Sequence, residues 1–182
     1  MNSLKRLYNW TLDKANHKNA KWYLSIISFA ESSFFPIPPD LLLIPMALAS
    51  KTKALFYAFI CTLSSVLGGI FGYAIGYFFF NSIGLYIVEF YHLENSFSIF
   101  ENYYKEFGIL IVLGAGITPF PYKFITIASG VFGLNIYLFV IVSIIGRGLR
   151  FYLIAILLYF FGEKIKLFID KYFNILSITF FI

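Results

Sequence analysis

The stretch 31–45 restricts the possible folds of this chain most. It lies inside an apolar block, residues 23–50, and combines four prolines with Glu31 and Asp40. Proline lacks an amide donor and clashes with the preceding helical turn, so the block cannot form one straight helix. In lipid, the freed backbone groups need partners inside protein or in a water-filled cavity. We therefore expect residues 24–50 to form a re-entrant hairpin lining a polar pocket. The prolines at its break are Pro36, Pro38 and Pro39.

The composition is typical of an all-α integral membrane protein. Of the 182 residues, 60% are hydrophobic and 13% are charged, and the mean hydropathy is +0.81. The net charge of +5 comes mainly from basic residues near the two ends, which indicates membrane orientation rather than nucleic-acid binding. One cysteine and two histidines provide no disulfide framework and no metal-ligand set. We expect no metal, no cofactor and no enzymatic activity.

Two apolar runs, residues 54–80 and 136–161, are long enough to cross the hydrocarbon core of a bilayer, which is about 30 Å thick. The first run carries a small residue at every fourth position. Such residues form a smooth ridge that another helix can approach closely. Ordinary helix packing is the preferred interpretation of this ridge, and a lipid-facing groove is the alternative. The small residues are Ser64, Gly68, Gly72 and Gly76.

Segments of mixed character flank the two runs. Residues 1–22 place apolar residues at helical spacing among five basic ones, which predicts an amphipathic helix on an anionic membrane surface. A solvated tail with accidental periodicity is the alternative. Residues 81–107 contain four glutamates and predict an interfacial helix, and residues 163–182 form a C-terminal tail. The apolar block 108–134 predicts a second re-entrant hairpin. Its prolines are Pro119 and Pro121.

The two halves of the chain match at a shift of 83 residues, which places Asp40 on Lys123. Each half consists of a broken hairpin, a short link and a spanning helix. If each hairpin enters and leaves on one side, the basic flanks share the cytoplasmic side with both termini. The acidic segment 81–107 then lies opposite, which satisfies the positive-inside rule. The repeats would be inverted, an arrangement typical of transporters.

Five ionisable residues lie within the apolar blocks. A charge at the centre of a membrane helix costs roughly 2.5–3.5 kcal/mol, so each should face protein or water. For the two arginines, which share one helix face, the structural alternative is pairing with the two carboxylates. Three cations against two anions leave a surplus of +1, which favours a transient anion. The five residues are Glu31, Asp40, Lys123, Arg147 and Arg150.

The charged residues that follow the two proline breaks, Asp40 and Lys123, differ in how well they suit the start of a helix. Asp40 after Pro39 suits the first turn of a helix, so a purely structural role there is the alternative to a functional one. Glu31 could likewise cap an arm of the hairpin. Lys123 occupies the equivalent place in the second half, where the helix dipole disfavours a cation. It therefore suggests a partner, either a carboxylate or an anionic ligand.

Four motifs in this order resemble the DedA family, also called the VTT or SNARE-associated membrane protein superfamily, and its YqaA-like branch in particular. The resemblance covers about residues 24–162. The motifs are Glu31-Ser-Ser-x-x-Pro-x-Pro-Pro-Asp40, Gly68-Gly69-x-x-Gly72-Tyr73-x-x-Gly76, Thr118-Pro-x-Pro-Tyr-Lys123 and Gly146-Arg-x-x-Arg150.

The resemblance implies an inverted-repeat fold in the bacterial inner membrane and the translocation of lipids. Relatives are linked to recycling of polyprenyl-phosphate carriers and to flipping or scrambling of phospholipids, often with dependence on the proton-motive force. By this resemblance, Glu31 and Asp40 match the acidic positions of the first hairpin, and Arg147 and Arg150 match a basic pair. Mainstream members carry arginines around the second hairpin's proline, whereas here Ile117, Thr118 and Lys123 occupy that region.

The leading hypothesis is a flippase- or scramblase-like transporter of an anionic lipid. The phosphate head group would meet Lys123, Arg147 and Arg150, whose donors suit phosphate. Glu31 or Asp40 would exchange protons. A non-transporting scaffold, in which the charges only hold the hairpins together, is the alternative. An enzyme or an ion channel has less support because no catalytic constellation or filter-like sequence is present. The sequence leaves the lipid and the oligomeric state open.

Overall fold

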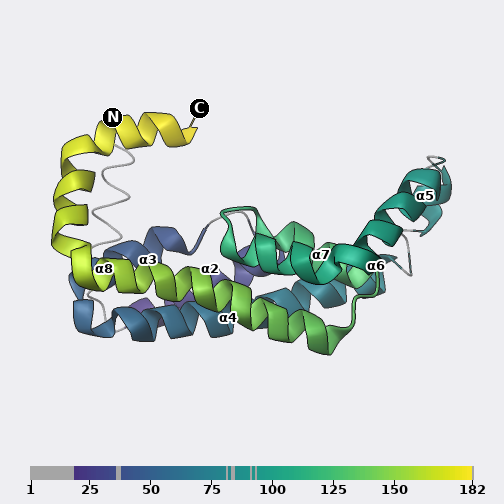
Figure 1. The fold of residues 1–182 in the computed structure, drawn as a ribbon, viewed down its shortest axis with the longest axis horizontal. Coiled ribbons are helices and arrows are strands. Elements are labelled where there is room, and N and C mark those ends of the chain that lie inside the picture. The colour runs from purple at the N-terminus through teal and green to yellow at the C-terminus, as the bar shows by residue number, and fades with distance from the viewer. Residues whose placement is uncertain are drawn as a thin grey trace.

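The computed structural model describes residues 19–35, 38–80, 82, 85–90, 92 and 94–181, and every regular element in these ranges is helical (Figure 1). The prediction of an all-α chain is confirmed for this part. Most of the expected N-terminal amphipathic segment, residues 1–18, lies outside the described residues, as does Pro36. Residues 20–22 of that segment belong to the first described helix.

The first apolar block forms two short helices, α2 (Ala20–Ser33) and α3 (Asp40–Ala49). Pro38 and Pro39 lie between them, and Pro39 is the N-cap of α3. Proline is tolerated there because the first amides of a helix have no intrahelical partner, and an acid in the first turn favours the helix. Pro45 lies inside α3, which continues past it. Of the prolines described in this block, those between the two helices mark the break, and Pro45 does not end its helix.

Two long apolar helices correspond to the predicted spans. A 3₁₀ turn, η1 (Lys51–Lys53), leads into α4 (Ala54–Phe79), and α8 (Ile136–Phe181) follows the second broken block. By length and composition, Lys51–Phe79 and Ile136–Gly162 could each cross a membrane. The helix α8 also continues through the expected C-terminal tail, and its ribbon turns away from the bundle near that end (Figure 1).

The middle of the chain differs from the predicted division into residues 81–107 and 108–134. After α5 (Leu85–Phe90), one helix, α6 (Glu94–Ile117), runs without interruption across the expected boundary. No proline lies near the expected boundary at residues 107 and 108. Gly108 does not end the helix, because a glycine inside a helix costs only about 1 kcal/mol. The break comes at the prolines instead. Pro121 is the N-cap of the next helix, α7 (Tyr122–Val131).

Helix α4 packs against α2, α7 and α8. Gly68, Gly72 and Gly76 are all buried on it and allow close approach of backbone. A β-carbon on Gly68 would overlap the carbonyl of Phe29 in α2, and one on Gly76 would overlap the carbonyl of Ile127 in α7. Ser64 is also buried. The small-residue ridge therefore serves as a contact surface for two neighbouring helices.

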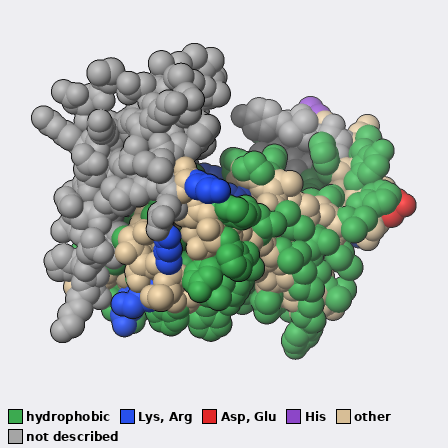
Figure 2. All heavy atoms as spheres, turned by 60° about the vertical axis from the view of Figure 1, so that its left-hand side comes forward, with side chains coloured by type: hydrophobic (Ala, Val, Ile, Leu, Met, Phe, Trp, Pro, Cys, Tyr) green, Lys and Arg blue, Asp and Glu red, His purple; other side chains and the backbone are tan. Residues whose placement is uncertain are grey.

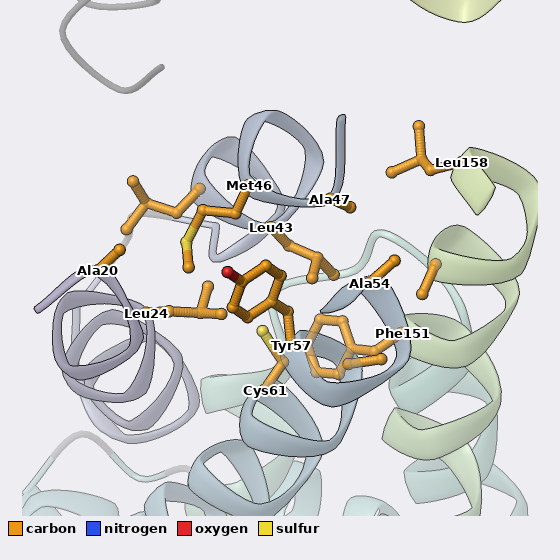
Figure 3. Close-up of a cluster of buried hydrophobic side chains, with 13 residues drawn as sticks. Ala20, Leu24, Leu43, Met46, Ala47, Ala54, Tyr57, Cys61, Phe151 and Leu158 are labelled. Carbon is orange, nitrogen blue, oxygen red and sulfur yellow. The ribbon is translucent and has the colours of Figure 1, made fainter. Parts of the chain in front are cut away.

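Two apolar clusters hold the helices together. Side chains from α2, α3, α4 and the middle of α8 converge in the first (Figure 3). The second lies where α6, α7 and the beginning of α8 meet. A layer of buried polar side chains accompanies these clusters, and it includes one arginine. The labelled members of the first cluster include Leu24, Leu43, Tyr57 and Phe151, and the second contains Val112, Ala115, Tyr122 and Phe139.

Large apolar side chains also cover much of the outer surface. Figure 2 shows hydrophobic side chains over a broad area, with Lys and Arg gathered toward one end of the view and Asp and Glu at the other. Both long helices contribute to this surface. The exposed residues include Phe56, Phe59, Leu63, Leu67 and Phe71 of α4, and Leu149, Leu153, Ile156 and Phe160 of α8.

Candidate functional site

The candidate site is built from two arginine–carboxylate pairs that join α8 to the first broken block. Arg147 binds Glu31 from the last turns of α2, with 2.6 Å between Nη2 and Oε2. Arg150, one turn further along α8, binds Asp40 at the start of α3. The four residues were all predicted as site residues, and the structure joins them in pairs. This is the arrangement that the structural alternative for the arginines required.

Arg147 is enclosed on every side that the structure describes. Its side chain is 1% exposed, and its guanidinium carbon lies 4.9 Å from the centre of the Tyr122 ring and 4.7 Å from that of Phe151. These rings belong to different apolar clusters, so the arginine lies between the two clusters. Cation–π contacts with a desolvated guanidinium contribute about 2 kcal/mol or more. The charge is therefore both neutralised and packed in place.

Hydroxyl groups extend the Arg147 pair into a network. The Nε of Arg147 donates to the Ser65 hydroxyl at 2.5 Å. Ser65 shares a hydrogen bond of 2.6 Å with Ser32, and Ser32 donates to the Glu31 carboxylate at 3.1 Å. Thr126 of α7 donates to the Ser32 carbonyl at 3.0 Å. The network thus connects α2, α4, α7 and α8 through groups that are buried and satisfied, as such groups must be.

Arg150 has a more open environment. Its side chain is 14% exposed, and its second partner is the main-chain carbonyl of Thr118, to which Nη1 donates at 2.6 Å. The carbonyl is brought within reach by a close crossing of α6 and α8, where a β-carbon on Gly116 would lie 3.1 Å from the α-carbon of Gly146. Arg150 therefore links the first broken block, through Asp40, to the second, through Thr118.

One oxygen of Asp40 is left without a partner. Its Oδ2 binds Arg150, but Oδ1 is buried and accepts no hydrogen bond in the part of the chain that the structure describes. A buried carboxylate oxygen without a donor costs free energy, on the order of 1–3 kcal/mol or more for a charged group. A hydrogen-bond donor from a ligand would relieve this cost at Oδ1.

Lys123 is the surplus cation of the set. It is the second residue of α7, half-buried, and its Nζ lies 5.3 Å from the centre of the Phe124 ring. Within the described ranges it forms no ion pair with a carboxylate, so the structure does not bring it together with Glu31 or Asp40. Pro119 and Pro121, which precede it, are exposed.

A shallow, open apolar groove of about 600 Å³ lies on the outer face of α8, and all of its lining residues belong to that one helix. Gly148 lies between Arg147 and Arg150 in the sequence and contributes to the groove. In the described part of the chain, no group of three His, Cys, Asp or Glu residues could hold a metal ion. The groove is lined by Ile144, Ile145, Gly148, Leu149, Tyr152, Leu153, Ile156 and Leu157.

Sequence reasoning did not identify the hydroxyl groups as part of the site. Ser65 adjoins the small-residue ridge, and Ser32 lies inside the first motif, but single serines are too common to mark a hydrogen-bond network. Tyr122 follows Pro121 in the third motif, and its hydroxyl donates to Ser143 at 2.5 Å. Only the fold shows that its ring lies against Arg147.

The fold and the site define an α-helical protein with two apolar helices of membrane-spanning length, the second of which is joined to a proline-broken segment by two arginine–carboxylate pairs. An uncharacterized protein of Haemophilus influenzae is 37% identical over 158 residues, which is 87% of this chain and 82% of that protein. An uncharacterized protein of Histophilus somni is 39% identical over 161 residues, with the same coverage. The chain belongs to the same family as these two proteins. No family model and no solved structure matches it.

Proposed function

We propose that this chain is a DedA-like integral protein of the bacterial inner membrane. Two helices have the necessary length and apolar character, and large apolar side chains face outward on both. Such a surface would be a liability in water but suits lipid. The pairs α2–α3 and α6–α7 would be the two broken hairpins of an inverted repeat, with both chain termini in the cytoplasm.

The proposed activity is the movement of an anionic lipid, such as a phospholipid or a polyprenyl phosphate, between the two leaflets. The observation that carries this proposal is the pairing of two arginines with two carboxylates beside both proline breaks. Buried ion pairs are often no more stable than apolar residues of similar volume. Ionisable groups at membrane depth therefore indicate a functional site, because packing alone does not require them.

The chemistry of the site suits exchange between a carboxylate and a phosphate. A phosphate offers the same planar pair of acceptors to a guanidinium that a carboxylate does. Protonation of Glu31 or Asp40 would remove the competing negative charge, which couples head-group binding to protons. Lys123 supplies an additional cation, and the apolar outer face of α8 would lie against the acyl chains in the bilayer.

Replacing Arg150 by alanine should abolish lipid movement in proteoliposomes, because a head group would lose its most accessible guanidinium. The assay follows fluorescent phosphatidic acid, phosphatidylglycerol and a polyprenyl phosphate under an imposed proton gradient. Lys105→Ala is the matched control, since it removes an exposed cation that pairs with Glu101 on α6. Full activity of Arg150→Ala would refute this site assignment.

The complete pairing of the four charges also favours a non-transporting scaffold as the second candidate. A scaffold needs the pairs only for stability, so the wild-type protein would move none of these lipids. The swapped protein Asp40→Arg with Arg150→Asp separates the two candidates further. It should preserve the fold if pairing is the only requirement, whereas a head-group site should lose transport.

The inverted repeat makes a prediction about topology. Cysteines introduced at Lys53 and at Lys105, in a Cys61→Ala background, should react with a membrane-impermeant maleimide from opposite sides of intact cells or inverted vesicles. Both positions are exposed, whereas the native Cys61 is buried. Labelling of both from one side would contradict the proposed topology.

A further inference from the structure

The two arginines of α8 differ in the contacts that hold them. We propose that Arg150 is a releasable latch that joins the two proline breaks and gives up its partners to the lipid phosphate, whereas Arg147 is a fixed positioning residue. This inference rests on the proposed function, and it divides between two residues a role that sequence reasoning assigned to both.

Arg147 lacks the access and the freedom that a head-group ligand needs. It is 1% exposed, and aromatic rings lie against it within 5 Å. Its hydrogen bonds go to Ser65 of α4 and Glu31 of α2, so moving it would separate three helices at once. Its role is to hold the Glu31 carboxylate and the α2–α4–α8 contact in one geometry.

Arg150 has the opposite properties. It is partly exposed, and none of the ring contacts that the structure describes includes it. Its acceptors, the Asp40 carboxylate and the Thr118 carbonyl, both belong to chain segments at the proline breaks. The guanidinium therefore joins α3 to the end of α6 through two terminal nitrogens. A phosphate could accept from the same two nitrogens and replace both partners together.

Release of Arg150 would free its two acceptors, the Asp40 carboxylate and the Thr118 carbonyl. Asp40 already has one buried oxygen without a donor in the described part of the chain, so the loss of its arginine would leave the second oxygen without this partner as well. The Thr118 amide donates to the Gly114 carbonyl at 3.0 Å, which ties Thr118 to the end of α6, and Pro119 immediately after it cannot continue this bonding. Lys123 lies on the other side of this break, at the second position of α7.

The chain contains only three arginines, which makes the inference directly testable. In an Arg6→Lys protein in detergent, modification by phenylglyoxal is followed at Arg147 and Arg150 by mass spectrometry. Arg150 should react at least tenfold faster. Dihexanoyl phosphatidic acid should slow its reaction, whereas dihexanoylglycerol, which lacks the phosphate, should not. Equal rates at the two arginines would overturn the division of roles.

Two variants test the latch without any lipid. Asp40→Asn should accelerate modification of Arg150 severalfold, whereas Glu31→Gln should leave Arg147 slow, because the rings and Ser65 still enclose it. The reverse pattern would refute the inference. If phosphatidic acid gives no protection, the head-group role of Arg150 is wrong. If the wild-type protein moves no lipid in proteoliposomes, the proposed function fails, whereas the unequal rates still establish that Arg150 is releasable and Arg147 is fixed.

Transport kinetics separate the positioning role from a merely structural one. Arg150→Lys retains the charge but loses the planar fork, so we expect about a tenfold rise in the half-saturating concentration of phosphatidic acid. Arg147→Lys should lower the maximal rate and leave half-saturation unchanged. A raised half-saturation in Arg147→Lys, with unchanged binding in Arg150→Lys, would reverse the assignment.

Discussion

Replacing Arg147 by methionine should lower the free energy of unfolding by about 3–5 kcal/mol. The substitution keeps much of the side-chain volume but leaves Glu31 as a charge without its guanidinium partner, and Ser65 without its donor. The Glu31 side chain is only 12% exposed, so water cannot fully replace the lost partner. Unfolding in mixed micelles, followed by circular dichroism, would measure the change.

The double variant Arg147→Met with Glu31→Met is the matched control. It removes both charges, and apolar side chains of similar size often replace a buried ion pair at little cost or with a gain. We therefore expect it to recover most of the lost stability, a large departure from additivity. A double variant that is less stable than the single one would show that the network depends on Arg147 through contacts other than its charge pair.

Gly68→Ala should destabilise the protein by about 1–3 kcal/mol, the range typical of overpacking in a tight core. The added β-carbon would overlap the backbone carbonyl of Phe29, and a backbone group cannot rotate away as a side chain can. The two helices α2 and α4 must therefore separate. Thermal unfolding would measure the lost stability. Faster amide exchange in α2 and α4 would report the separation of the two helices, which the Ser28 and Ser33 hydroxyls otherwise join by donating to carbonyls of α4.

Gly114→Ala provides the comparison on a third helix. A β-carbon there has no heavy atom within 4 Å, so alanine should stabilise α6 by up to about 1 kcal/mol through its higher helix propensity. The two substitutions add the same methyl group and should act in opposite directions. If both stabilise the protein, the close approach at Gly68 is not a feature of the folded state.

Features set by local chemistry could be predicted from the sequence. The long helices follow from sustained hydropathy, and the breaks follow from proline, which acts on the turn that contains it. The continuity of α6 could not be predicted in this way. Composition changes from amphipathic to apolar near Phe107, but backbone hydrogen bonding does not depend on that change, so the helix continues to Ile117.

The site was predicted as a set of residues but not as a geometry. Arg147 and Glu31 are 116 positions apart, and Arg150 and Asp40 are 110 apart, so their pairing depends on how α8 packs against the first block. Sequence alone left two outcomes open for the arginines, internal pairing or a free anion site. The rings of Tyr122 and Phe151 bury Arg147. No local sequence pattern places Tyr122, which belongs to α7, beside this arginine of α8.

The unbroken course of α6 makes it a rigid lever. Its 24 residues span about 36 Å at 1.5 Å per residue. Near one end, the Phe97 ring stacks on Phe80 and contacts Phe132, and just beyond the other end lies the Thr118 carbonyl that accepts from Arg150. Displacement of Thr118 would therefore tilt the whole of α6. A binder that clamps the aromatic end would restrain the Arg150 contact from a distance, without touching either proline break.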